Sequence, residues 1–252
     1  MLSLAVLLLF GCSVKEEQKE NYSDEMKITH AVDLSKEDGA DSVERDGDQK
    51  ESPYFKHPDF YNMKSTSTLT LLPKFKTIQQ TSEWSCGVDS ALMVLQYYGK
   101  LGEYNEETLA QFRTNKLKSE ATSLKSMIQI FEGVGGFKIH STYDYKESEY
   151  EKISLSMIQD YLKKGIPVMV AWNDWGGHWQ VIIGYDTMGT ETTQDDVLIV
   201  ADSYDTTDHN QDGYGIYPAE RFYYNWTMYD FFTKNYDVAE RDKLFIAVEP
   251  EV

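Results

Sequence analysis

The stretch that decides the fold is residues 80–99, QTSEWSCGVDSALMVLQYYG. Its second half predicts a helix, because the apolar residues from Ala91 to Tyr98 fall on one broad face and Gly99 provides a stop. Cys86 is expected at the start of this helix, where unpaired backbone amides and the helix dipole favour a thiolate. The stretch therefore predicts a nucleophilic cysteine at a helix N-terminus.

Cys86 also has no evident disulfide partner in the chain. The chain has 252 residues and 2 cysteines. The other, Cys12, ends an apolar leader (residues 1–12, MLSLAVLLLFGC) that is too short to cross a bilayer as a helix and resembles a bacterial lipobox. The alternative is a buried N-terminal strand or helix. We expect an exported protein of the bacterial cell envelope that touches the membrane only through a lipid on Cys12, where an unpaired thiol suggests catalysis.

The next segment, residues 13–53, is a polar tail with 13 Asp and Glu against 6 Lys and Arg. It has too few apolar residues to offset the entropy lost on ordering, so we predict an acidic disordered tether. The folded domain is expected over residues 54–252. The net charge of −18 would repel nucleic acid, which we do not expect as a partner.

The order of predicted elements favours an α+β domain. Helical patterns come first, at residues 87–99, 105–115, 122–136 and 154–165. A short extended lead-in precedes them at residues 65–75, and strand patterns follow at residues 166–172, 178–186 and 196–204. Helices followed by adjacent strands are not typical of a parallel, doubly wound sheet.

The partner of Cys86 should be a histidine that can form an ion pair with the thiolate. Among the 5 histidines, His178 stands at the start of a predicted strand after two glycines, and catalytic groups are often displayed beside loops. Asp202 closes the next predicted strand, so its carboxylate is placed to orient the imidazole. The competing residues are His30, His57, His140 and His209 for the base, and Asp186, Asp196 and Asp205 for the carboxylate.

These residues follow a papain-like order along the chain: Gln80, Cys86 with Gly87, His178 before an aromatic residue, and Asp202. Over about residues 77–226 the chain resembles the bacteriocin-processing peptidases that cleave double-glycine leaders, and most of all their stand-alone relatives. The resemblance implies a papain-like fold, with helices packed on an antiparallel sheet, and a Cys–His–Asp triad. It also implies that Gln80, six residues before the cysteine, is an oxyanion donor. The chain departs from the pattern at Val88, where many relatives carry proline.

Aromatic residues flank both predicted catalytic segments. Trp84, Trp175 and Trp179 are predicted to wall a cleft for an extended peptide or a glycan, and core packing is the alternative interpretation. Trp172 is expected in the core.

An acidic loop follows Asp202. Its alternating oxygen ligands and its glycine resemble the first half of a calcium loop, with Asp208, Asn210, Asp212 and the Tyr214 carbonyl as predicted ligands. The alternative is an Asx-rich turn without a metal.

The predicted function is that of a cysteine peptidase of the cell envelope, which acts on a peptide or protein and requires no cofactor. A peptidoglycan amidase or a transpeptidase would use the same triad. An inactive, calcium-braced module that holds a polymer in its aromatic cleft is the alternative from another class. Thiol reactivity of Cys86 separates the enzymes from the binding module.

Overall fold

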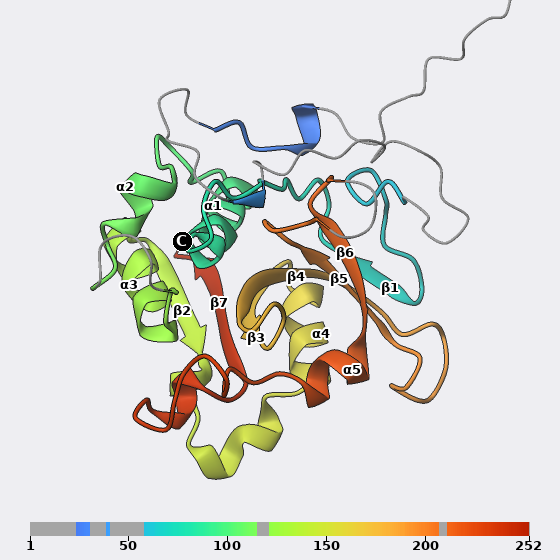
Figure 1. Ribbon diagram of the computed structural model, residues 1–252. Coiled ribbons are helices and arrows are strands. Elements are labelled where there is room, and N and C mark those ends of the chain that lie inside the picture. Colours follow the sequence, from blue (N-terminus) through green and yellow to red (C-terminus); the bar gives the residue numbers. More distant parts are fainter. Residues whose placement is uncertain (1–23, 31–38, 41–57, 115–120, 207–210, 252) are drawn as a thin grey trace, which may run out of the picture.

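The centre of the fold is one antiparallel sheet, seen in the computed structural model of Figure 1, which describes residues 24–30, 39–40, 58–114, 121–206 and 211–251. The strands follow the order β2–β7–β3–β4–β5–β6, and β1 also pairs with β4. Their bounds are β1 (Leu69–Leu71), β2 (Phe137–Ser141), β3 (Val168–Trp172), β4 (His178–Asp186), β5 (Val197–Ala201), β6 (Tyr214–Pro218) and β7 (Leu244–Pro250).

The helices pack against this sheet. They are α1 (Cys86–Tyr97), α2 (Glu106–Ala110), α3 (Leu124–Val134), α4 (Leu155–Lys163) and α5 (Ala219–Tyr224), with short 3₁₀ turns at Asp24–Met26, Thr142–Asp144, Glu147–Lys152 and Val238–Glu240. All five residues of β3 are buried, so both faces of the sheet are covered at its centre. Both α1 and α4 contact β4, whereas α3 contacts β2 and β7. The predicted α+β class with an antiparallel sheet is confirmed.

Side-chain caps determine where three of the predicted helices begin. Asn105, Ser123 and Ser154 each accept a hydrogen bond from a backbone N–H in the first turn of α2, α3 and α4, respectively. Each cap satisfies a donor that the helix itself leaves unpaired. Helix α2 ends at Ala110, five residues before the predicted end, and the chain continues in turns.

Two strands of the sheet, β6 and β7, are not among those predicted from the sequence. Strand β7 lies between β2 and β3 although it is the last element of the chain. Its first five residues are buried, and it pairs with β2 on one side and β3 on the other. Strand β6 forms the edge next to β5. Strand β7 thus holds one side of β3. On its other side β3 pairs with β4, which begins with His178.

The predicted tether is wrong for the part that the structure describes. Residues 24–30 and 39–40 pack on the domain instead of leaving it. Lys27 forms a parallel bridge with Thr77, and the N–H of Ile28 donates to the Thr77 carbonyl at 2.8 Å. Ala40 is fully buried. Backbone pairing therefore orders residues whose composition predicts disorder, and the rest of residues 13–53 lies outside the described residues.

The predicted leader, residues 1–12 with Cys12, also lies outside the described residues. Within the part that is described, none of the helices has the length and apolar character needed to cross a membrane.

Candidate active site

Cys86 is the first residue of α1, as predicted. Ser85 forms the N-cap position of the helix, and the Cys86 side chain is buried, with 5% of its surface exposed. Gly87 lets the helix approach its neighbours closely, because a Cβ there would lie 2.7 Å from the Cβ of Thr122. The thiol therefore lies at a helix N-terminus, where the dipole favours negative charge.

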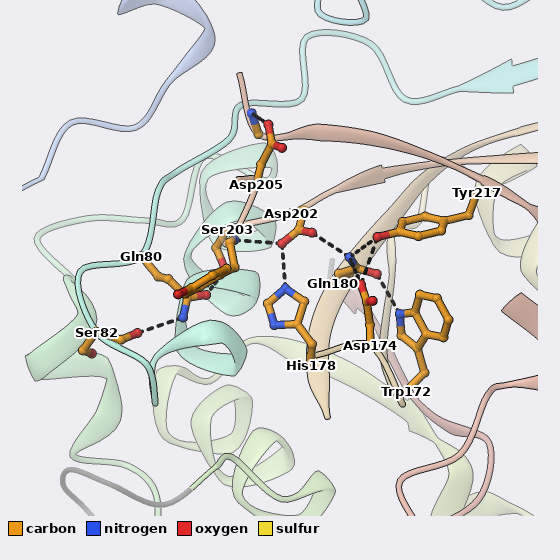
Figure 2. Close-up of polar contacts among 12 residues, drawn as sticks. Gln80, Ser82, Trp172, Asp174, His178, Gln180, Asp202, Ser203, Asp205 and Tyr217 are labelled. Atoms are coloured by element: carbon orange, nitrogen blue, oxygen red, sulfur yellow. Dashed lines mark hydrogen bonds and ion pairs between the residues drawn. The ribbon is translucent and has the colours of Figure 1, made fainter. Parts of the chain in front are cut away.

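His178 and Asp202 form a buried pair on neighbouring strands (Figure 2). The Nε2 atom of His178 lies 2.6 Å from Oδ1 of Asp202. His178 begins β4 and Asp202 directly follows β5, and these strands pair antiparallel, so the start of one meets the end of the other. The backbone N–H of Tyr204 donates to the same Asp202 oxygen at 2.8 Å. The structure therefore brings together the histidine and the aspartate that were predicted from among five histidines and several aspartates.

The electrostatics of this pair favour the ion pair over two neutral groups. Burial alone would lower the pKa of His178, but the charge of Asp202 and the hydrogen bonds that the imidazolium donates to Asp202 and to Cys86 raise that pKa well above its usual value. Burial would raise the pKa of Asp202, but the charge of His178 outweighs this effect and lowers it. Because Asp202 occupies Nε2, Nδ1 is left for the thiol. The arrangement matches a thiol, a base and an orienting carboxylate.

Gln80 is buried in the loop that runs alongside these groups, with 1% of its surface exposed. Its side chain donates to the Ser82 carbonyl at 2.8 Å and accepts from the Ser203 hydroxyl at 2.8 Å. Its backbone N–H donates to the Ser203 carbonyl at 2.9 Å. A side-chain amide has two N–H donors, and the second makes no hydrogen bond with the described residues.

Sequence reasoning missed Gln180, which supports the carboxylate from behind. Its Nε2 donates to Oδ2 of Asp202 at 2.7 Å, and its Oε1 accepts from the Trp172 indole at 2.7 Å (Figure 2). Asp174 and Tyr217 complete this network. Burial, followed by the charge of Asp202, raises the pKa of Asp174. Gln180 lies two residues after His178 in β4, and that period-two spacing is the signal that could have found it.

Cys86, His178 and Gln80 open into one hollow of about 240 Å³. Its other lining residues are Glu83, Trp175, Gly177, Tyr204 and Phe231. A larger hollow of about 370 Å³ lies between β2 and α4, but no cysteine lines it, so we assign the chemistry to the smaller one. Phe231 lies in the C-terminal segment, for which the sequence predicted no site role.

Of the three tryptophans predicted to wall a cleft, Trp175 does so and two do not. Trp175 is 62% exposed and lines the hollow beside Cys86. Trp179 is buried, and its indole donates to the Thr122 carbonyl at 2.7 Å. Trp84 is also buried, with the Arg113 guanidinium over its ring. The prediction is therefore wrong for Trp84 and Trp179, which are buried against Arg113 and Thr122, respectively.

The predicted calcium loop lies only partly within the described residues, because Asp208 and Asn210 fall outside them. Oδ1 of Asp212 accepts a hydrogen bond from the Tyr214 N–H at 2.9 Å. The ammonium group of Lys27 interacts with the Asp212 carboxylate. Burial lowers the pKa of Lys27, and the charge of Asp212 opposes that shift. The residues that the structure describes form no group of three or more side chains suited to a metal. Calcium binding stays a prediction.

Comparison with known proteins gives the family of this chain. The model of the Peptidase_C39 like family matches residues 73–233, which is more than half of the chain. The chain belongs to this family. The C39-like chain is also similar to the crystal structure of a protein assigned as a C39-like peptidase from Bacillus anthracis, with a TM-score of 0.50 and 15% identity, over 73% of this chain and 99% of the other. A search of curated proteins finds no significant match.

Family membership confirms the predicted papain-like fold and indicates a hydrolase of the cysteine-peptidase type. The solved structure supports the fold alone at this level of identity. The match begins at residue 73, so it includes the loop with Gln80, the start of α1 and both strand ends that carry His178 and Asp202.

The His178–Asp202 pair predicts a pH dependence of stability. Because the pKa of His178 is raised in the fold, its contribution is complete below the ordinary pKa of about 6.5 and is lost as the pH rises through the folded value. In a Cys86→Ala background, Asp202→Asn should therefore lower the free energy of unfolding most near pH 6. The difference should shrink toward alkaline pH in urea titrations. A difference that grows with pH would contradict the ion pair.

Proposed function

We propose that the C39-like chain is a cysteine peptidase of the cell envelope that uses Cys86, His178 and Asp202 as a catalytic triad. The observation that carries the proposal is that Cys86, His178 and Gln80 line one hollow while Asp202 holds the far side of the imidazole. A buried thiol in a core would not need a base with an orienting carboxylate.

In the proposed first step, His178 takes the thiol proton and the Cys86 sulfur attacks the carbonyl carbon of a peptide bond. The carbonyl oxygen becomes an oxyanion, which the second side-chain N–H of Gln80 and the backbone N–H of Cys86 stabilise. His178 then gives its proton to the amide nitrogen, the C–N bond breaks, and a thioester remains. A water attacks the thioester with His178 as base, and this releases the acid and restores the thiol.

Asp202 has a positioning role in this scheme. Its hydrogen bond to Nε2 orients the ring with Nδ1 toward the sulfur, and its charge stabilises the imidazolium that forms. Gln180 and the Tyr204 N–H keep the carboxylate in place. The hollow is walled by Trp175, Tyr204 and Phe231, which suits an extended peptide with apolar or aromatic side chains.

Thiol labelling tests the nucleophile. Iodoacetamide should alkylate Cys86 at pH 7 at least about tenfold faster than a free model thiol, because a neighbouring imidazolium favours the thiolate. His178→Ala should remove this advantage, whereas His140→Ala, on the outer strand β2, should not. Mass spectrometry of the labelled protein gives the rates. Labelling of the wild-type protein at the rate of a model thiol would support the inactive binding module.

Peptide cleavage tests the reaction. A peptide library incubated with the wild-type protein should yield defined products, and Cys86→Ala should abolish them. Asp202→Asn should lower kcat/KM by about 10²–10⁴-fold, and Gln80→Ala by about 10²–10³-fold. Liquid chromatography with mass spectrometry measures these rates. Rapid thiol labelling without cleavage of any peptide would redirect the search to peptidoglycan amides or a transpeptidase acceptor.

We also propose that Cys12 carries a lipid that anchors the protein to the envelope, on the strength of the apolar leader that ends at this cysteine. Expressed in a bacterium that processes lipoproteins, the protein should incorporate a fatty-acid label and sediment with membranes. Cys12→Ala should lose both properties while keeping Cys86 reactive. Label incorporation that survives Cys12→Ala would overturn the assignment.

A further inference from the structure

Two carboxyl groups that the triad does not use are buried together beside it. Asp89 is fully buried on α1, one turn after Cys86, and Glu106 is 1% exposed at the start of α2. Their carboxyl groups lie within hydrogen-bonding reach of each other. Two ionised carboxylates cannot form a hydrogen bond, because neither has a proton to donate and their charges repel.

Glu106 holds the loop that carries Gln80. One of its oxygens accepts from the backbone N–H of Thr81 at 2.9 Å, and the other accepts from the Thr81 hydroxyl. Thr81 itself is 1% exposed. The residue next to Gln80 is therefore fixed to α2 by both oxygens of one carboxylate, which acts as an acceptor in both bonds.

Asp89 lacks the donors that a buried carboxylate requires. Neither of its oxygens accepts a hydrogen bond from an N–H or O–H donor among the described residues. The Ser85 hydroxyl lies close enough to lower the pKa of Asp89, but its one proton is donated to the Ser82 carbonyl at 3.1 Å. An ionised carboxylate in such a site is costly, whereas a protonated one can donate to Glu106.

We propose that Asp89 keeps its proton at neutral pH and donates it to Glu106, and that the two are positioning residues that hold Thr81 and thereby aim Gln80 at the oxyanion. The role of Gln80 rests on the proposed function, but the shared proton does not. Burial, and then the charge and hydrogen bond of Glu106, raise the pKa of Asp89 well above its usual value. The groups that act on Asp89 are Glu106 from α2 and Cys86 and Ser85 from the start of α1.

The shared proton is tested by the pH dependence of stability. Above the ordinary Asp pKa of about 3.9, the native protein holds a proton that the unfolded chain has lost, so its stability falls as the pH rises. Relative to Asp89→Asn, the folding equilibrium constant of the wild-type protein should fall about tenfold per pH unit until the folded pKa is reached. The control Asp160→Asn, an exposed carboxyl on α4, should show no such slope. Parallel stability curves for the wild-type protein and Asp89→Asn would overturn the proposal.

A second measurement uses the wild-type protein alone, so it does not depend on whether a variant folds. In the wild-type protein labelled with ¹³C at aspartate carboxyl carbons, one signal should stay at the protonated chemical shift at pH 7. Ionisation of every aspartate with an ordinary midpoint would equally overturn the shared proton.

The positioning role is tested by comparing two reactions at Cys86. Alkylation by iodoacetamide uses no oxyanion donor, whereas peptide hydrolysis does. Glu106→Ala should lower kcat/KM at least about tenfold while the alkylation rate stays within about twofold of wild type. Asp89→Ala should lower kcat/KM more than Asp89→Asn, whose amide can replace the shared proton. The matched control is Glu107→Ala, an exposed residue of the same helix.

The outcomes separate this proposal from the proposed function. If no peptide is cleaved by the wild-type protein, the hydrolase assignment fails, and the stability slope and the carboxyl signal still decide the shared proton. If peptides are cleaved and Glu106→Ala cleaves them at the wild-type rate, the positioning role is wrong and the triad stands.

Discussion

The hydrogen bond between His178 and Asp202 depends on the pairing of β4 with β5, and much of the surrounding structure maintains it. The imidazole and the carboxylate both lie away from solvent, so each would be costly to ionise alone. Together they are stable because Gln180 and the Tyr204 N–H satisfy the remaining oxygen lone pairs. A shift of β5 along β4 by one residue would turn Asp202 to the other face of the sheet and separate the pair.

The loop from Gln79 to Ser82 joins the two halves of the site. On one side Gln80 exchanges hydrogen bonds with Ser203, the residue after Asp202. On the other side Thr81 is bound to Glu106 of α2. The helix that carries the thiol and the strand end that carries the carboxylate are therefore connected through a few buried polar contacts, which are stronger and more directional away from water.

The sequence was sufficient for the parts of the site that local pattern controls. The apolar face after Cys86 placed the thiol at a helix start, and two adjacent strand patterns brought His178 to Asp202. It was insufficient where the partner is distant in the chain. Nothing local shows that β7 inserts beside β3, that Thr122 and its neighbours cover Trp179, or that Glu106 meets Asp89. Residues 24–30 have a polar composition, and contacts with distant residues such as Thr77 order them.

With the proposed lipid on Cys12, the docking of residues 24–30 would limit how far the domain can stand from a membrane. A lipid on Cys12 would be followed by only 11 residues before Asp24, where the described segment begins. Fully extended, the 12 steps from Cys12 to Asp24 reach about 40 Å, whereas a free linker from Cys12 to residue 54 would reach about 145 Å. The proposed peptidase would then work within roughly one domain diameter of the bilayer, and substrates farther from the membrane would be out of its reach.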